Sequence, residues 1–181
     1  IPAISQHIRV YKNEVFAMLC QGFPPAVDPH CHTLILGSMP GVRSLEQQEY
    51  YAHPANRFWP LLAKILGNEP LPALYANRIE MLLTHHIALW DSLGSCERSG
   101  SLDSAIRSEQ ANDFPALFTT YPNLKKICFN GTKSAQAFKK HHPELRLDPQ
   151  KIFIELPSTS PANARWQGEA LEAVWRQALL S

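Results

Sequence analysis

The sequence predicts an α/β fold with three layers (α/β/α), in which a central four-stranded parallel sheet lies between helices. Four short apolar runs indicate buried strands, because each is rich in Ile, Leu or aromatic residues and ends in a turn-forming or polar cluster. These runs are Thr33–Gly37, His86–Trp90, Lys126–Asn130 and Ile152–Leu156. Helices are expected between them, and such alternation is typical of a parallel sheet covered on both faces.

The expected helices follow from apolar residues at helical intervals. The first spans Arg57–Ile65 and is followed by the stop signal Gly67. Asp113–Thr120 and Thr132–His141 are the next two helices, and an apolar stripe from Leu171 to Leu179 marks the last one. A chain of 181 residues has room for one compact domain and little else.

Composition excludes several classes of protein. Apolar residues make up 45% and charged residues 18% of the chain, which excludes a disordered or fibrous protein. The net charge of +1 excludes a strong general attraction to nucleic acid or membranes, so any DNA role must rest on a local site. No apolar run is long enough to span a membrane or to form a signal peptide. We therefore expect a monomer in the cytoplasm, in the bacterial cytosol or nucleoid.

The cysteines give no support to a zinc site. The four residues are dispersed and none belongs to a C-x-x-C pair, which leaves an iron–sulfur cluster only as an alternative in which distant ligands converge. We expect no metal and no cofactor.

Four polar stretches each follow a predicted strand. In open α/β sheets, ligands bind outside the carboxyl ends of the strands. The stretches rich in Gly, Ser, Thr, Asn and Pro are Gly37–Ser44, Asp91–Cys96, Asn130–Lys133 and Pro157–Ala164. Their convergence predicts a binding crevice lined by backbone amides and short polar groups.

A cluster of aromatic and polar residues lies between the first two strands. The segment from Tyr50 to Trp59 reads YYAHPANRFW and combines four aromatic rings with a histidine, an asparagine and an arginine. A ring that stacks and a carboxamide that hydrogen-bonds are what a pocket for a planar heterocycle requires.

The motifs GSMPGVRSL, YYAHPANRFW, ALWDSLGSCERSGSLDSAI and LPSTSPANA resemble those of the uracil-DNA glycosylase superfamily. They are most similar to its hypoxanthine-DNA glycosylase branch. The resemblance covers residues 22–181, a single DNA glycosylase domain, and leaves residues 1–21 as an N-terminal extension. It implies a monofunctional enzyme of base excision repair that flips out a deaminated base and hydrolyses its N-glycosidic bond. Hypoxanthine is the expected substrate; the alternatives are uracil or xanthine, or a member that binds damaged DNA without catalysis.

Two positions depart from the usual superfamily pattern. Met39 occupies the place of a water-positioning Asn or Asp, and Leu156 that of a His or Asn. A thioether cannot orient or deprotonate water. The hypoxanthine branch lacks the same groups, so the resemblance makes Asn56 the candidate catalytic residue. The alternative for Asn56 is a helix N-cap.

The resemblance also implies which residues contact the base. Tyr51 is the candidate stacking ring; the alternatives are a core aromatic at this position, or stacking by Tyr50. Asp91 can accept a hydrogen bond from N1–H of hypoxanthine while a backbone amide meets O6, and it would repel the bare N1 of adenine. Uracil N3–H would also suit Asp91, and an Asx turn or helix cap is its alternative role. The loop expected to cradle the base consists of Gly37, Ser38, Met39, Pro40 and Gly41.

Contacts with DNA are expected from polar and basic residues around the crevice. The candidates are Arg43, Asn130, Lys133, Ser158, Thr159, Ser160 and Asn163. Ser160-Pro161 also reads as the N-cap and first residue of the last helix, whose N-terminus would favour a phosphate. The resemblance implies that residues 161–163 press into the minor groove as a wedge, a weak one because their side chains are small.

Overall fold

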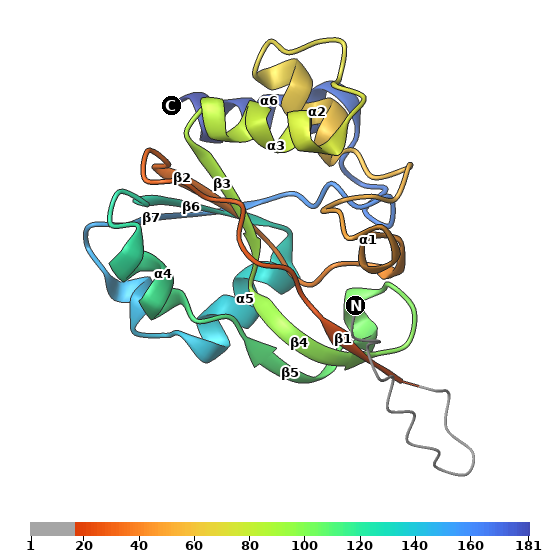
Figure 1. Cartoon of the computed structure of the whole chain (residues 1–181), viewed down its shortest axis with the longest axis vertical. Helices are drawn as coiled ribbons and strands as arrows, with labels where there is room; N and C mark the ends of the chain where they lie inside the picture. Colours follow the sequence, from red (N-terminus) through yellow and green to blue (C-terminus); the bar gives the residue numbers. More distant parts are fainter. Residues whose placement is uncertain (1–16) are drawn as a thin grey trace, which may run out of the picture.

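The computed structural model describes residues 17–181 and contains the expected parallel sheet. Its strands are ordered β3-β2-β6-β7 (Figure 1). Their bounds are Thr33–Gly37 for β2, Ile87–Asp91 for β3, Lys126–Asn130 for β6 and Ile152–Leu156 for β7. All three strand pairings are parallel, so the predicted fold class is confirmed, and β3 begins and ends one residue later than predicted.

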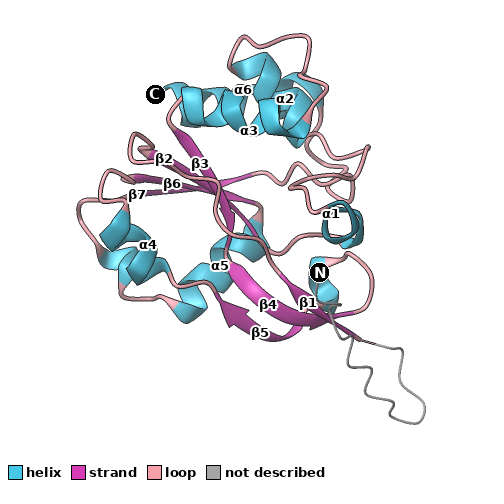
Figure 2. Cartoon of the chain, in the orientation of Figure 1, coloured by secondary structure: helices cyan, strands magenta, loops and turns pink. Residues whose placement is uncertain are grey.

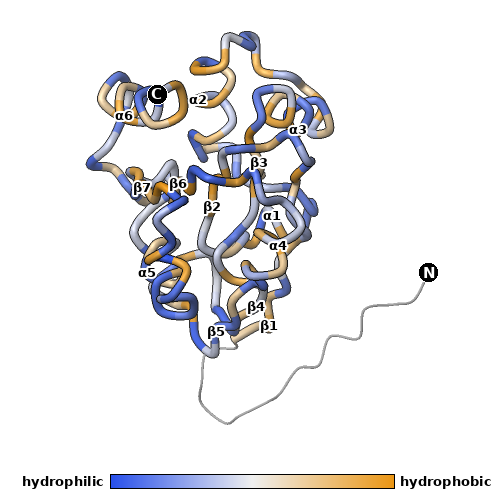
Figure 3. The backbone as a smooth tube through the Cα atoms, turned by 90° about the vertical axis from the view of Figure 1, so that its left-hand side faces the viewer, coloured by the Kyte–Doolittle hydropathy of each residue, from blue (hydrophilic) through white to orange (hydrophobic). Residues whose placement is uncertain are grey.

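Helices cover both faces of this sheet (Figures 1 and 2). On one face lie α2 (Phe58–Ile65), α3 (Tyr75–Thr84) and α6 (Gly168–Leu180); on the other lie α4 (Phe114–Thr120) and α5 (Thr132–His141). The short helix α1 (Val42–Gln47) follows β2, beyond the carboxyl end of this strand. The strands β2 and β3 are buried along their whole length, and Figure 3 shows hydrophobic residues along β2, β6 and β7 in the centre. No helix within residues 17–181 is both long and apolar enough to cross a membrane.

A second, antiparallel sheet was missing from the sequence-based prediction. It has the order β1-β4-β5, with β1 at Met18–Gln21, β4 at Leu93–Arg98 and β5 at Arg107–Ala111. Because β1 pairs with β4, the expected domain boundary at residue 22 cuts through this sheet. The rest of the expected extension, residues 1–16, lies outside the described residues.

The last helix begins later than predicted. Ser160 Oγ accepts a hydrogen bond from the amide of Ala162 (3.2 Å), but this closes only a local turn. Helix α6 starts at Gly168, after Gln167 as N-cap. The segment from Pro157 to Gln167, here called the closing loop, therefore crosses the carboxyl edge of the sheet as irregular chain. Two single 3-10 turns, Asp103–Ala105 and Leu145–Leu147, complete the described elements.

Candidate active site

A cavity of about 570 Å³ opens at the carboxyl ends of the parallel strands. Its volume lies in the range of about 300–1,000 Å³ that is usual for small-molecule sites. It gathers nearly all residues predicted from sequence, namely Gly37, Ser38, Met39, Pro40, Gly41, Arg43, Tyr51, Asn56, Asp91, Asn130, Ser158, Thr159, Ser160 and Asn163. Lys133 is absent from the lining. The cavity thus lies where the ends of the four strands converge.

The floor of the cavity is built by Gly37 and Asp91, which face each other as the last residues of β2 and β3. A Cβ atom on Gly37 would collide with Oδ1 of Asp91 and would lie 2.9 Å from the hydroxyl oxygen of Tyr51. Glycine is therefore required at this position, because both polar groups occupy the space of a side chain. The carboxyl group of Asp91 and the phenol of Tyr51 thus lie close together at the floor of the cavity.

The side chain of Asp91 is buried, with 4% of the residue exposed. Its Oδ2 has no hydrogen-bond partner among the described residues, so the side chain forms neither the Asx turn nor the helix cap considered above. Burial raises the pKa of Asp91 to about 8; the negative charge of Asp103 adds to this effect and Arg98 opposes it. The carboxyl group is therefore mostly neutral at pH 7, with one O–H donor and a free acceptor.

Tyr51 forms part of the cavity wall. Its ring stacks on Phe58 with centroids 3.9 Å apart and planes at 21°. Its hydroxyl is buried without a hydrogen-bond partner among the described residues, and burial raises the pKa of Tyr51 far above its usual value. The backbone of Tyr51 has φ +54°, a left-handed conformation that costs about 1–2 kcal/mol in a non-glycine residue. Such strain is concentrated at functional sites.

Asn56 belongs to a hydrogen-bond chain that crosses the cavity wall. Asn130 Nδ2 donates to Thr159 Oγ1 (2.9 Å), and Thr159 Oγ1 donates to Asn56 Oδ1 (2.9 Å). The same Oδ1 accepts from the amide of Phe58 (3.0 Å) at the start of α2. The oxygen of Asn56 therefore has two donors, and only the amide N–H groups remain to serve the cavity. The oxygen of Asn56 binds the first amide of α2, although Arg57 occupies the N-cap position, and the nitrogen of Asn56 offers hydrogen-bond donors.

The predicted DNA contacts Asn130 and Thr159 are instead internal. Asn130 Oδ1 accepts from the amide of Thr159 (2.9 Å), so the two side chains hold each other by two hydrogen bonds. Thr159 is fully buried and Asn130 is 8% exposed. Their hydrogen-bonding groups position the closing loop beside Asn56 in this structure, and their contact with DNA stays a prediction.

Arg57 holds the closing loop in place by hydrogen bonds. Its guanidinium donates to the carbonyl oxygens of Ser160 (2.7 Å) and Asn163 (2.9 Å) and to that of Trp166. The hydroxyls of Ser158 and Ser160 accept from loop amides two residues on. The irregular loop thus obtains from one arginine the hydrogen bonds that a helix would have supplied.

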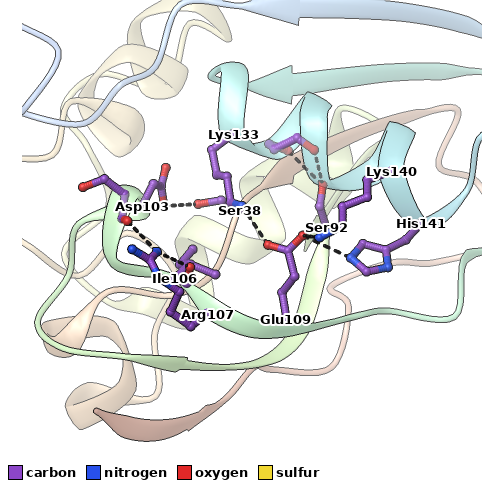
Figure 4. Close-up of polar contacts among 11 residues, drawn as sticks. Ser38, Ser92, Asp103, Ile106, Arg107, Glu109, Lys133, Lys140 and His141 are labelled. Carbon is purple, nitrogen blue, oxygen red and sulfur yellow. Dashed lines mark hydrogen bonds and ion pairs between the residues drawn. The ribbon is translucent and has the colours of Figure 1, made fainter. Parts of the chain in front are cut away.

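Lys133 points into an ion-pair cluster (Figure 4). Its Nζ lies 2.7 Å from Oε2 of Glu109, while Lys140 and His141 bind Oε1 at 2.9 and 3.2 Å. Burial alone would raise the pKa of Glu109, but the hydrogen bonds from these three residues outweigh it and lower the pKa to about 2. Lys133 is thereby paired with a carboxylate outside the cavity lining, and its contact with DNA stays a prediction. No motif in the sequence pointed to Glu109.

Met39 and Leu156, the two departures from the superfamily pattern, are both buried. Met39 is 6% exposed and packs in a small apolar cluster with Cys20 and Cys96. Leu156 is 2% exposed and belongs to the main core. Neither position offers a group that binds water, so this role falls to other residues of the cavity.

Sequence reasoning missed Arg98 and Asp103. Arg98 is 1% exposed, donates to the carbonyl oxygen of Pro40, and has no carboxylate partner among the described residues. Asp103 Oδ1 accepts from Ser38 Oγ (2.6 Å) (Figure 4). Both lie in the quoted motif ALWDSLGSCERSGSLDSAI, but only the second sheet brings them to the loop after β2.

Comparisons with known proteins point to one family. A family model described as the uracil DNA glycosylase superfamily matches residues 24–179. A protein of Methanosarcina barkeri named hypoxanthine DNA glycosylase is 42% identical over 80% of this chain and 89% of its own. A protein of the same name from Methanosarcina acetivorans is 37% identical over 88% and 99%. The solution NMR structure of a candidate uracil DNA glycosylase from Methanosarcina acetivorans has a TM-score of 0.74, with 36% identity over 89% of this chain and 99% of that one.

Proposed function

The chain belongs to the uracil DNA glycosylase superfamily, and we propose that it is a monofunctional DNA glycosylase that removes deaminated bases, with hypoxanthine preferred. The observation that carries this proposal is the buried carboxyl group of Asp91 at the floor of the cavity, beside the ring of Tyr51. The names of the two most fully covered relatives support the choice of base.

A neutral Asp91 matches the edge of hypoxanthine with both of its oxygens. One accepts from N1–H, and the other donates its proton to O6. Negative charge collects on the base as the glycosidic bond breaks, so the hydrogen bond to O6 strengthens in the transition state. The ring of Tyr51, supported from behind by Phe58, stacks on the base. The pair N3–H and O4 of uracil fits the same carboxyl group, which makes uracil a slower substrate rather than an excluded one.

An ionised Asp91 would exclude adenine by repelling its bare N1. A neutral Asp91 excludes adenine less strongly. Its O–H can donate to N1 of adenine while its carbonyl oxygen accepts from N6–H. Selection against adenine therefore also depends on extrusion, because a mispaired base costs less free energy to unstack than a paired one.

Hydrolysis passes through a sugar with oxocarbenium character, which is a strong electrophile and needs a positioned water more than a deprotonated one. The amide N–H groups of Asn56 can hold the oxygen of that water, since its carboxamide oxygen is already occupied. The hydrogen bonds from Thr159 and Phe58 fix the orientation of the amide. We assign the positioning of water to Asn56.

Base release from labelled duplexes tests the proposed function. Duplexes with deoxyinosine, deoxyuridine, deoxyxanthosine or deoxyadenosine at one position are incubated with the wild-type protein, and the free base is identified by mass. We expect hypoxanthine to be released fastest, and the strand to stay intact until alkali cleaves the abasic site. Damage-specific binding without release of any base would instead support a non-catalytic member, the function that Met39 and Leu156 would suit. Strand cleavage without alkali would contradict the monofunctional assignment.

A further inference from the structure

An exposed leucine lies at the rim of the cavity. Among residues 17–181, eight large apolar side chains are exposed, and Leu102 alone of these also lines the cavity. Leu102 is 61% exposed and precedes the 3-10 turn in the connection between β4 and β5. Single exposed leucines are common on protein surfaces, so the position of this one is what needs an explanation.

The residues on both sides of Leu102 are anchored. Ser101 Oγ accepts from the amide of Val42 (2.8 Å), and Asp103 Oδ1 accepts from Ser38 Oγ (2.6 Å). The carbonyl of Leu102 itself accepts from the amide of Ala105 (3.0 Å). The backbone is thus held against the loop after β2, while the apolar side chain is left in solvent.

The part of the closing loop that lines the same cavity offers no comparable side chain. Its residues in the lining are Ser158, Thr159, Ser160, Pro161, Ala162 and Asn163, and Arg57 binds three of the loop carbonyls tightly. In Figure 1 the closing loop and the β4–β5 connection lie on the same side of the molecule, near α1. The closing loop therefore contributes only small residues to the rim of the cavity, whereas the β4–β5 connection contributes a leucine.

We propose that Leu102 is the wedge that enters the base stack when the target nucleotide is extruded, an inference that rests on the proposed function. Apolar side chains inserted between base steps unstack them and compensate for the lost base contacts. Leu102 has the size, the exposure and the fixed backbone for this task. This proposal assigns the wedge to Leu102 in place of residues 161–163, the candidates from the sequence analysis.

Single-turnover release of hypoxanthine from duplex and single-stranded DNA tests this assignment, because only the duplex requires a wedge. We expect Leu102→Ala to lower the duplex-to-single-strand rate ratio at least tenfold, an order of magnitude consistent with the cost of unstacking a step, and Leu102→Met to restore most of it. The matched control is Leu147→Ala, which truncates a leucine that is 82% exposed and lies outside the cavity lining. An unchanged ratio in Leu102→Ala, including equal losses on both substrates, would overturn the assignment. A duplex-specific loss that appears only in Pro161→Gly would also overturn it.

A second readout does not depend on hydrolysis. The fluorescence of 2-aminopurine placed next to deoxyinosine rises when the stack opens, and we expect the wild-type protein to raise it and Leu102→Ala to do so far less. A wild-type protein that opens the stack but releases no base would contradict the proposed function and leave the wedge supported. Equal fluorescence with both proteins would refute the wedge, whatever the outcome for base release.

Discussion

At the scale of single residues, the site depends on one buried carboxyl group. The role that we propose for Asp91, as a donor to O6, requires its neutral form, which persists up to a pH near 8 because burial raises its pKa. Above that pH an ionised Asp91 would oppose the negative charge that develops on the leaving base. We therefore expect the protonation state of this residue to set the alkaline limit of the reaction.

We predict that hypoxanthine release by the wild-type protein falls about tenfold per pH unit above pH 8, the slope for loss of one proton. Asp91→Asn keeps an N–H donor and a carbonyl acceptor without a titratable proton, so its rate should stay nearly flat from pH 6 to pH 10. Single-turnover rates across this range measure both profiles. An alkaline decline of the same shape in Asp91→Asn would show that another group controls it.

The environment of Asp91 could not be predicted from sequence. Its position at the end of a strand followed from the apolar run before it, but its burial depends on Gly37 and Tyr51, which lie far away in the chain. The same holds for Asn56, whose oxygen is occupied by Thr159 from the closing loop. A motif supplies the residue type, and the fold decides which atoms remain available.

At the scale of elements, the closing loop and the last helix differ most from the prediction. The Ser-Pro pair is a genuine helix-start signal in local terms, yet Arg57 binds the loop carbonyls in an irregular conformation. The strands β4 and β5 were missed because they are mostly polar, without the apolar run that marks a buried strand. Buried parallel strands can be predicted from sequence because they do contain such an apolar run.

We predict that Arg57→Met lowers the free energy of unfolding by about 2–4 kcal/mol, because several charge-assisted hydrogen bonds to loop carbonyls are lost. The matched variant Arg43→Met removes an exposed arginine at the cavity rim and should change stability by less than about 0.5 kcal/mol. Denaturant titration compares the two.

The same pair separates loop anchoring from phosphate contact. If Arg43 contacts a phosphate, Arg43→Met should reduce the salt slope of DNA binding by about one unit. A large loss of stability in Arg43→Met, or none in Arg57→Met, would contradict these roles.

At the scale of the whole molecule, the buried carboxyl group lowers stability as the pH rises. The ordinary pKa of 3.8 applies to Asp91 in the unfolded chain and about 8 in the folded one, so folding takes up a proton between these values. Below pH 4 both states are protonated, and above pH 8 both have lost the proton. The destabilisation therefore grows across this window and then levels off.

We predict that the difference in unfolding free energy between Asp91→Asn and the wild type grows in favour of the variant from pH 4 to pH 8, by at most about 1.4 kcal/mol per pH unit. Thermal and denaturant unfolding over this range measure it. A difference that is independent of pH would mean that Asp91 is ionised in the folded protein at neutral pH.

In the proposed reaction, the cavity hydrolyses the glycosidic bond of deoxyinosine with a water held by the amide of Asn56. Asn56→Asp tests this role, since it keeps an oxygen to accept from Phe58 and Thr159 and replaces the N–H donors with a carboxylate oxygen that can only accept. The measurement is the single-turnover rate of hypoxanthine release from a deoxyinosine duplex, with unfolding monitored in parallel. We expect a loss of at least about a hundredfold in rate, comparable to removing one transition-state hydrogen bond, with folding retained. A rate close to that of the wild type would contradict it and would leave Asn56 as a helix cap.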